Sequence, residues 1–145
     1  MQENIPNIAS EANNLKHIAR NKCYEISYSK TKNRLYFNVL GFWKNKESVP
    51  DLLHDWEKAL SLVSPGFTVL VDMRTMITHP QELNGLHEEF MQMAQDAHVS
   101  RVVNVMPDDK IASLQVGEIV LRSNMQIQTF DTFEAADKWL DQPSA

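Results

Sequence analysis

A carboxylate and a guanidinium stand two residues apart, at Asp72 and Arg74, where a short and mostly apolar run ends. The run, residues 67–73, is typical of a central strand that is covered on both faces. Open α/β sheets bind ligands beyond the carboxyl ends of such strands. The two charges are therefore positioned to meet a ligand or a partner, or to pair with each other within the turn.

Polar residues in two later segments extend this candidate surface. Asp108 and Asp109 follow the next predicted strand, and the carboxyl ends of neighbouring parallel strands meet at one edge of a sheet. We therefore predict a surface that binds a protein partner or a second copy of the chain. Its candidate residues are Asp72, Arg74, Thr75, Thr78, His79, Glu82, Asp108 and Asp109.

Catalytic patterns are missing from the sequence. It contains no Gly-x-Ser-x-Gly elbow and no glycine-rich phosphate loop, and its four glycines are far apart. The single cysteine, Cys23, lies in a predicted strand, where a lone cysteine is usually a small core residue. We predict that the protein is not an enzyme and has no catalytic residues; an enzyme that uses His79 with Asp72 is the least favoured alternative.

The five histidines do not form a metal-binding pattern. A zinc-binding helix places a second histidine four residues after the first, and His87 has no such follower. A zinc site needs three or four converging ligands, which this spacing does not supply. We therefore predict no metal and no cofactor.

Methionines near the predicted strand ends suggest an apolar pocket as a second hypothesis. Met73, Met76 and Met106 lie at the ends of neighbouring strands or in the loop beyond, and methionine suits both core gaps and adaptable binding surfaces. The pocket would hold an apolar small molecule or lipid between the sheet and the second helix. Gly85 in that helix predicts close packing or a hinge. The predicted lining is Phe42, Trp43, Met76, Leu83, Leu86 and Phe90.

Hydrophobic periodicity predicts one α/β domain in residues 21–142, preceded by an arm in residues 1–20 that contains a short helix around 9–18. The element order is β-β-α-β-α-β-α-β-α, which predicts a mixed sheet of four or five strands with about four helices. Predicted strands cover 23–28, 34–43, 67–73, 99–106 and 125–130, and predicted helices cover 49–63, 80–97, 107–122 and 133–140. In the third helix, burial is predicted for some combination of Ile111, Ala112, Leu114, Val116, Ile119 and Val120.

The charges are divided unevenly along the chain. Residues 1–50 carry eight basic and four acidic side chains, whereas residues 51–145 carry six basic and fifteen acidic ones. The net charge of −5 argues against general nucleic-acid binding, which depends on Lys and Arg to neutralise phosphates. No apolar run reaches the ~20 residues of a membrane span, and the amino terminus lacks a secretory pattern. With a single cysteine, these features predict a cytoplasmic protein.

Several local strings resemble the STAS-type domain of anti-sigma-factor antagonists, in the branch called SpoIIAA-like. The resemblance runs from about Lys22 to Asp141. Its strings are Leu40-Gly41-Phe42-Trp43, Val69-Leu70-Val71-Asp72, Lys110-Ile111-Ala112 and the segment from Phe130 to Leu140.

The resemblance implies a SpoIIAA/STAS-like sheet related to the lipid-carrying CRAL-TRIO fold, and a regulatory or protein-binding role. Phosphorylatable members carry a serine about nine or ten residues after the aspartate of the strand. Counting from Asp72 reaches Gln81 and Glu82, so the usual serine is missing. The nearest hydroxyl groups, those of Thr75 and Thr78, lie in the loop before that position.

Overall fold

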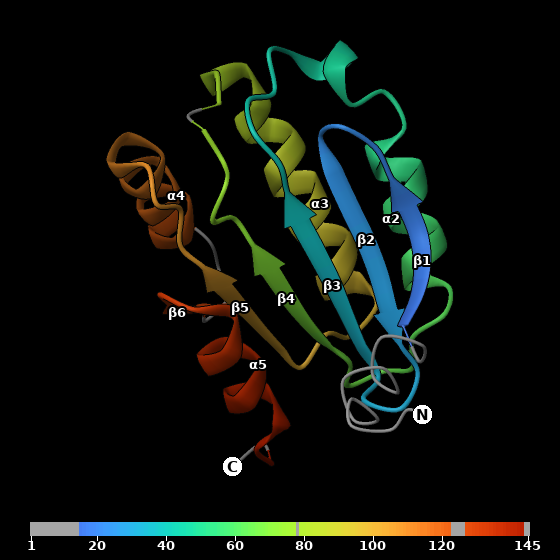
Figure 1. Ribbon diagram of the computed structural model, residues 1–145. Helices are drawn as coiled ribbons and strands as arrows, with labels where there is room; N and C mark the ends of the chain where they lie inside the picture. The colour runs from blue at the N-terminus through green and yellow to red at the C-terminus, as the bar shows by residue number, and fades with distance from the viewer. Residues whose placement is uncertain (1–14, 78, 123–126, 144–145) are drawn as a thin grey trace, which may run out of the picture.

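The computed structural model describes residues 15–77, 79–122 and 127–143, which form one six-stranded sheet with helices on both faces (Figure 1). The strands follow each other across the sheet in chain order, β1 to β6. The first three are antiparallel neighbours, and β3 to β6 are parallel. The strands are β1 Leu15–Arg20, β2 Tyr24–Ser29, β3 Arg34–Val39, β4 Thr68–Asp72, β5 Arg101–Val105 and β6 Ile127–Phe130.

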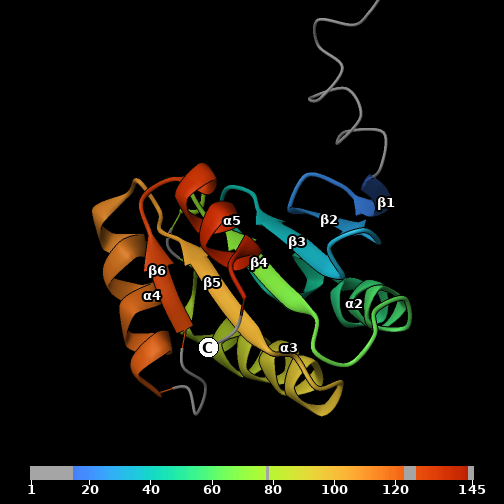
Figure 2. The ribbon, with the colours of Figure 1, turned by 90° about the horizontal axis from the view of Figure 1, so that it is seen from below.

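The described α-helices divide between the two faces of the sheet. They are α2 Leu52–Leu60, α3 Asn84–Asp96, α4 Lys110–Arg122 and α5 Phe133–Asp141, with short 3-10 helices η1 Lys46–Ser48 and η2 Gln81–Leu83. Helices α2, α3 and α4 cover one face, and α5 lies on the other (Figure 2). None of the helices in the described ranges is long and apolar enough to cross a membrane.

Strand β4 lies at the centre of the fold, and all five of its residues are buried. Val69 and Val71 pack into the larger core beneath α2, α3 and α4, whereas Leu70 points into a smaller core with Ala136 and Leu140 of α5. Successive strand side chains point to opposite faces, so a strand that is covered on both faces must be apolar throughout. The prediction of a central strand over residues 67–73 is therefore confirmed.

Strand β1 corrects the prediction for the amino-terminal arm. Residues 15–20 were expected to lie in an arm with a short helix, but they pair antiparallel with β2. Residues 1–14 lie outside the described ranges. A register shift between His17 and Ala19 brings Ile18 and Ala19 together against the core, which breaks the period-two pattern expected of a strand. Half of this edge strand is also exposed, so its sequence carries little apolar signal.

The remaining elements follow the predicted order, and most of them have shorter bounds than predicted. With β1 added, the sheet has six strands rather than the predicted four or five. The strand expected over 34–43 ends at Val39, because the chain turns at Gly41, which has a positive φ of 63°. The helix expected over 49–63 is the nine-residue α2. Asp109 caps α4 by accepting a hydrogen bond from the Ala112 N–H at 3.2 Å.

Candidate functional site

Three loops are joined by backbone hydrogen bonds at the carboxyl ends of β3, β4 and β5. The Gly41 N–H donates to the Thr75 carbonyl at 3.2 Å, and the Ile77 N–H donates to the Gly41 carbonyl at 3.0 Å. The Asp108 N–H donates to the Arg74 carbonyl at 3.2 Å. We call the exposed side chains on these loops the strand-end surface: Phe42, Arg74, Thr75, Ile77, Asp108 and Asp109.

Asp72 and Arg74 form a paired unit at the centre of this edge. The Arg74 Nε and Nη2 atoms donate to the two Asp72 carboxylate oxygens at 3.0 and 2.8 Å, and the Arg74 N–H donates to the same carboxylate at 3.2 Å. The guanidinium also lies over the Phe133 ring, 5.9 Å from its centroid. The hydrogen bond to Asp72 is the largest of the effects that raise the pKa of Arg74. The sequence left two outcomes open, and the structure shows the one in which Asp72 and Arg74 pair with each other within the turn.

His79 is a core residue rather than a surface group. Its side chain is 2% exposed and stacks on Trp43, with ring centroids 4.7 Å apart. Its Nδ1 atom lies 3.3 Å from Nε2 of His87. Its backbone is held by Gln115 of α4, whose amide accepts from the His79 N–H at 2.9 Å and donates to the His79 carbonyl.

Burial keeps both histidines of this stack neutral. It lowers the pKa of His87 to about 4. Burial, followed by repulsion from His87, lowers the pKa of His79 to about 4, against a smaller opposing effect of the Gly41 backbone. The His79 Nε2 atom is buried and makes no hydrogen bond within the described part of the chain. The stack therefore acts as an uncharged part of the core at neutral pH.

The other predicted site residues are divided between the strand-end surface and its surroundings. Thr75 is exposed, and its hydroxyl donates to the Val39 carbonyl at 3.3 Å. Asp108, Asp109 and Glu82 are exposed, the last of them on η2. Thr78 lies outside the described residues. Asp72 and His79, the two residues of the alternative catalytic pair, bond to other residues. Asp72 pairs with Arg74, and the His79 ring pairs with His87.

The space between the sheet and α3 is small. A cavity of about 70 Å³ lies there, and Met76 and Phe90 are the predicted lining residues that border it. Trp43, Leu83 and Leu86 are buried in the main core, whereas Phe42 is exposed. Known ligand pockets measure roughly 300–1,000 Å³, so in this conformation the cavity has no room for a lipid.

Gly85 has a different environment from the one that the sequence suggested. A Cβ atom built at Gly85 meets no heavy atom within 4 Å outside the local helix. The residue is exposed in the first turn of α3. Of the two alternatives predicted for Gly85, close packing is therefore wrong, and a hinge stays a prediction.

A groove of about 340 Å³, lined mostly by residues of polar type, lies on the opposite face, over β1 to β3 and beside α5. Sequence reasoning missed it, although the signal was present in the alternation of β2 and β3. Glu25, Ser27 and Ser29 share one face of β2 because the alternate residues belong to the core. The groove is lined by Leu15, His17, Glu25, Ser27, Ser29, Thr31, Lys32, Tyr36, Asn38, Phe133 and Asp137.

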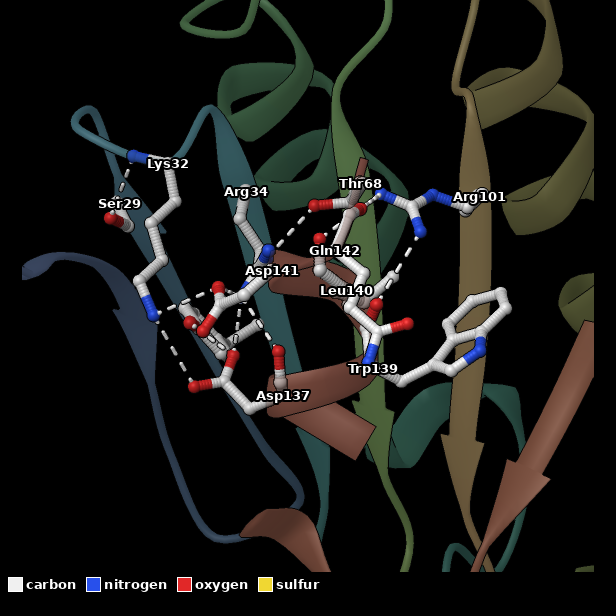
Figure 3. A network of polar contacts seen from close by, with 11 residues as sticks. Ser29, Lys32, Arg34, Thr68, Arg101, Asp137, Trp139, Leu140, Asp141 and Gln142 are labelled. Atoms are coloured by element: carbon white, nitrogen blue, oxygen red, sulfur yellow. Dashed lines mark hydrogen bonds and ion pairs between the residues drawn. The ribbon is translucent and has the colours of Figure 1, made fainter. Parts of the chain in front are cut away.

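A charge network around the buried Arg34 side chain connects β3 to α5, and Lys32 and Asp137 of this network also line the groove (Figure 3). The Arg34 Nη1 atom contacts carboxylate oxygens of Asp137 at 2.6 Å and of Asp141 at 2.9 Å. The Tyr36 hydroxyl donates to the same Asp137 oxygen at 2.7 Å. Burial and then Asp137 raise the pKa of Tyr36, so its hydroxyl stays protonated. These bonds join β3 to α5 and make the network structural.

The described residues contain no group of three or more His, Cys, Asp or Glu side chains placed to hold a metal ion. The His79–His87 pair supplies two imidazoles, but each is packed against Trp43. Two nitrogen ligands do not make the four-coordinate site that zinc requires.

Comparison with known proteins connects the fold to one described by a crystal structure. No protein-family model and no curated protein sequence matches the chain. A solved structure that resembles it is an uncharacterised protein of the DUF3478 family from Shewanella loihica PV-4, described as having a SpoIIAA-like fold. The TM-score is 0.53 at 14% sequence identity, over 87% of this chain and 91% of that one. The predicted SpoIIAA-like fold is confirmed.

Proposed function

We propose that this domain is a non-catalytic binding module that docks a protein partner on the strand-end surface. The observation that carries the proposal is the pairing of two exposed apolar side chains, Phe42 at 52% and Ile77 at 51% exposure. The parallel bridge between Gly41 and Met76 aligns the two segments that carry them. Phe42 and Ile77 directly follow the two bridged residues, and we infer that they form one apolar patch.

Charged groups around this patch indicate the chemistry of the partner. Asp108, Asp109 and Glu82 are exposed acidic residues on this edge, while the charge of Arg74 is offset by Asp72. Protein interfaces combine an apolar centre with a polar rim, and complementary charges favour the correct partner. We therefore expect an apolar side chain on the partner, flanked by Lys or Arg.

The buried histidines support a binding role over a catalytic one. A general base must come within hydrogen-bond reach of the substrate, and His79 is enclosed by Trp43, His87 and the loop that Gln115 holds. Asp72 makes three contacts with Arg74 and is therefore committed to it. A predicted dyad of His79 and Asp72 would require both residues to exchange their present partners.

Affinity capture with matched surface variants tests the proposal. We expect a partner that binds the wild-type chain to be lost with Phe42→Asp and Ile77→Asp, and weakened with Asp108→Lys, which reverses an exposed acidic charge of the rim. Leu62→Asp is the control, because Leu62 is an exposed apolar residue that follows α2. Equal capture by all four variants would remove the strand-end surface as the binding site.

The apolar-carrier hypothesis remains a separate prediction with its own test. It requires α3 to move away from the sheet, because Leu83, Leu86 and Phe90 now fill the space beneath η2 and α3. Native mass spectrometry of the purified chain would detect a co-purifying lipid as an added mass. A spectrum of the protein alone would count against this hypothesis.

A further inference from the structure

Helix α4 has a second apolar face that points to solvent. Ile111, Leu114 and Leu121 are 64%, 74% and 86% exposed. At about 100° per residue, these positions fall on one side of the helix, opposite the buried Ala112 and Val116. Of the residues for which burial was predicted, Ala112 and Val116 are buried and Val120 is partly buried, whereas Ile111 and Leu114 are exposed.

The outward-facing side of α4 combines apolar, charged and small residues. Within an arc of about 120°, it carries one basic residue, one acidic residue, one glycine and the three exposed apolar residues. We call this set the α4 outer face: Lys110, Ile111, Leu114, Gly117, Glu118 and Leu121. A surface helix of a monomeric domain normally presents polar residues there, so three large apolar side chains indicate a partner.

We propose that the occupant of the α4 outer face is α4 of a second copy of the chain, packed antiparallel about a two-fold axis at Leu114. In a two-fold interface, residue i of one copy meets residue j of the other, and j meets i. Lys110 and Glu118 lie four residues on either side of Leu114. Antiparallel packing therefore places each Lys110 opposite Glu118 of the second copy, and the pair forms twice.

The glycine fits the same register. Ile111 and Gly117 lie three residues on either side of Leu114, so each Ile111 side chain meets the glycine of the second copy. A Cβ atom built at Gly117 meets nothing within 4 Å, so no contact within the described chain accounts for a glycine there. The absence of a side chain leaves space for a bulky residue from the opposing helix.

Charge complementarity makes a second copy a specific occupant rather than a generic one. Parallel packing in the same register would place Lys110 beside Lys110 and Glu118 beside Glu118, which is repulsive. Antiparallel packing also sets the amino end of each helix beside the carboxyl end of the other, where the helix dipoles attract. A 13-residue helix is about 20 Å long, so the interface is small and the dimer is weak.

Sedimentation velocity of the full chain tests this dimer across protein concentrations from about 1 to about 500 μM. We expect a reversible shift from monomer to dimer as the concentration rises. Leu114→Glu places a carboxylate at the two-fold axis and should raise the dissociation constant at least about tenfold. Circular dichroism checks that the variant remains folded, as expected for an exposed position.

Charge reversal provides the decisive comparison. Lys110→Glu and Glu118→Lys should each weaken self-association, because each creates like-charged pairs across the axis. A mixture of the two variants should form a heterodimer at lower concentration than either alone, since opposite charges meet again at both ends. The double variant Lys110→Glu/Glu118→Lys should self-associate like the wild type.

Matched charge changes on α2 serve as controls. Lys58→Glu and Glu57→Lys alter exposed residues of that helix and should leave self-association unchanged, alone or mixed. A chain that stays monomeric throughout the concentration range would overturn the proposal. So would a dimer that is indifferent to Leu114→Glu, or mixed charge variants that gain nothing over the single ones.

Discussion

Arg34 of β3 and Asp137 of α5 are 103 residues apart in the chain and 2.6 Å apart in space, measured from Nη1 to Oδ1. Arg34 is 2% exposed, so its guanidinium is almost fully withdrawn from water. Its Nε atom donates to the Thr68 hydroxyl at 2.9 Å on the neighbouring strand. Burial alone would lower the pKa of Arg34, but hydrogen bonds to Tyr36, Asp137 and Asp141 raise it overall. The charge is thus buried with its partners in place.

Removing Asp137 should destabilise the fold strongly. Asp137→Ala leaves the Arg34 charge buried with one fewer carboxylate and also removes the acceptor of the Tyr36 hydroxyl. We expect the free energy of unfolding to fall by about 3 kcal/mol, the usual cost of breaking a buried ion pair from one side. Urea denaturation followed by circular dichroism measures the change.

Lys32→Ala is the matched control within the same network. Lys32 contacts Asp137 and Asp141 at 3.5 and 3.2 Å, but its side chain is better exposed than that of Arg34. Such a pair contributes less than about 1 kcal/mol. A loss for Asp137→Ala as small as that for Lys32→Ala would contradict the structural role of the network.

The buried histidine pair should make stability depend on pH. The folded-state pKa of His79 and of His87 is about 4, below the roughly 6.5 of an unfolded chain. Between these values the unfolded state binds more protons, so stability falls as pH decreases from about 6.5 towards 4. We expect a loss of about 2 kcal/mol for each histidine, and so about 4 kcal/mol for the pair, between pH 7 and pH 5. Urea unfolding at a series of pH values provides the measurement.

A double variant isolates the source of this pH dependence. His79→Phe/His87→Phe keeps aromatic rings against Trp43 but removes both titrating groups, so the slope between pH 7 and pH 5 should flatten. His54→Gln changes an exposed histidine of α2 and should keep the wild-type slope. An unchanged slope in the double variant would assign the effect to other groups.

The two hydrogen bonds between the Gln115 amide and the His79 backbone should both contribute to the free energy of unfolding. Gln115→Glu keeps an acceptor for the His79 N–H but removes the donor to the His79 carbonyl. Leaving one partly buried polar group unpaired costs about 1–3 kcal/mol. Gln92→Glu is the control, because the Gln92 amide donates to Asp96 on an exposed helix surface. Chemical denaturation of both variants measures how far the free energy of unfolding falls. Equally small losses would show that the Gln115 hydrogen bonds contribute little to stability.

Two glycine substitutions should have opposite signs. Gly41 has a φ of 63°, a conformation that disfavours any side chain, so Gly41→Ala should cost about 1 kcal/mol. Gly85 lies in an exposed helical turn with open space at its Cβ position, so Gly85→Ala should stabilise by about 0.5–1 kcal/mol. Thermal unfolding reports both changes, and a destabilising Gly85→Ala would restore a functional reason for that glycine.

Local patterns were sufficient to predict most elements of this fold. The apolar run over residues 67–73 predicted a buried central strand because its burial on both faces leaves a continuous signal. The periodicity of α2 placed Leu52, Trp56 and Ala59 on its buried face. Strand β1 was not predicted because its bulge and its exposed edge position interrupt the alternation of apolar and polar residues.

The strand-end surface was only partly predictable. The sequence indicated that Asp72 and Arg74 lie at a strand end, but two charges two residues apart can equally pair with each other or face outward. Exposure is decided by neighbours that are distant in sequence. His79 is buried because Trp43 and His87 stack around it, whereas Phe42 is exposed although the adjacent Trp43 is fully buried.

By itself, the sequence determined the α/β class, the order of nearly all elements and the location of a polar strand end, because these depend on short-range periodicity and turn residues. Tertiary structure alone decided which apolar residues of α4 face the sheet and which face solvent. It also decided that Arg34 is buried against Asp137 rather than exposed at the edge of a hairpin. These outcomes depend on contacts with segments that are distant in the chain, 103 residues apart for Arg34 and Asp137, which no local pattern records.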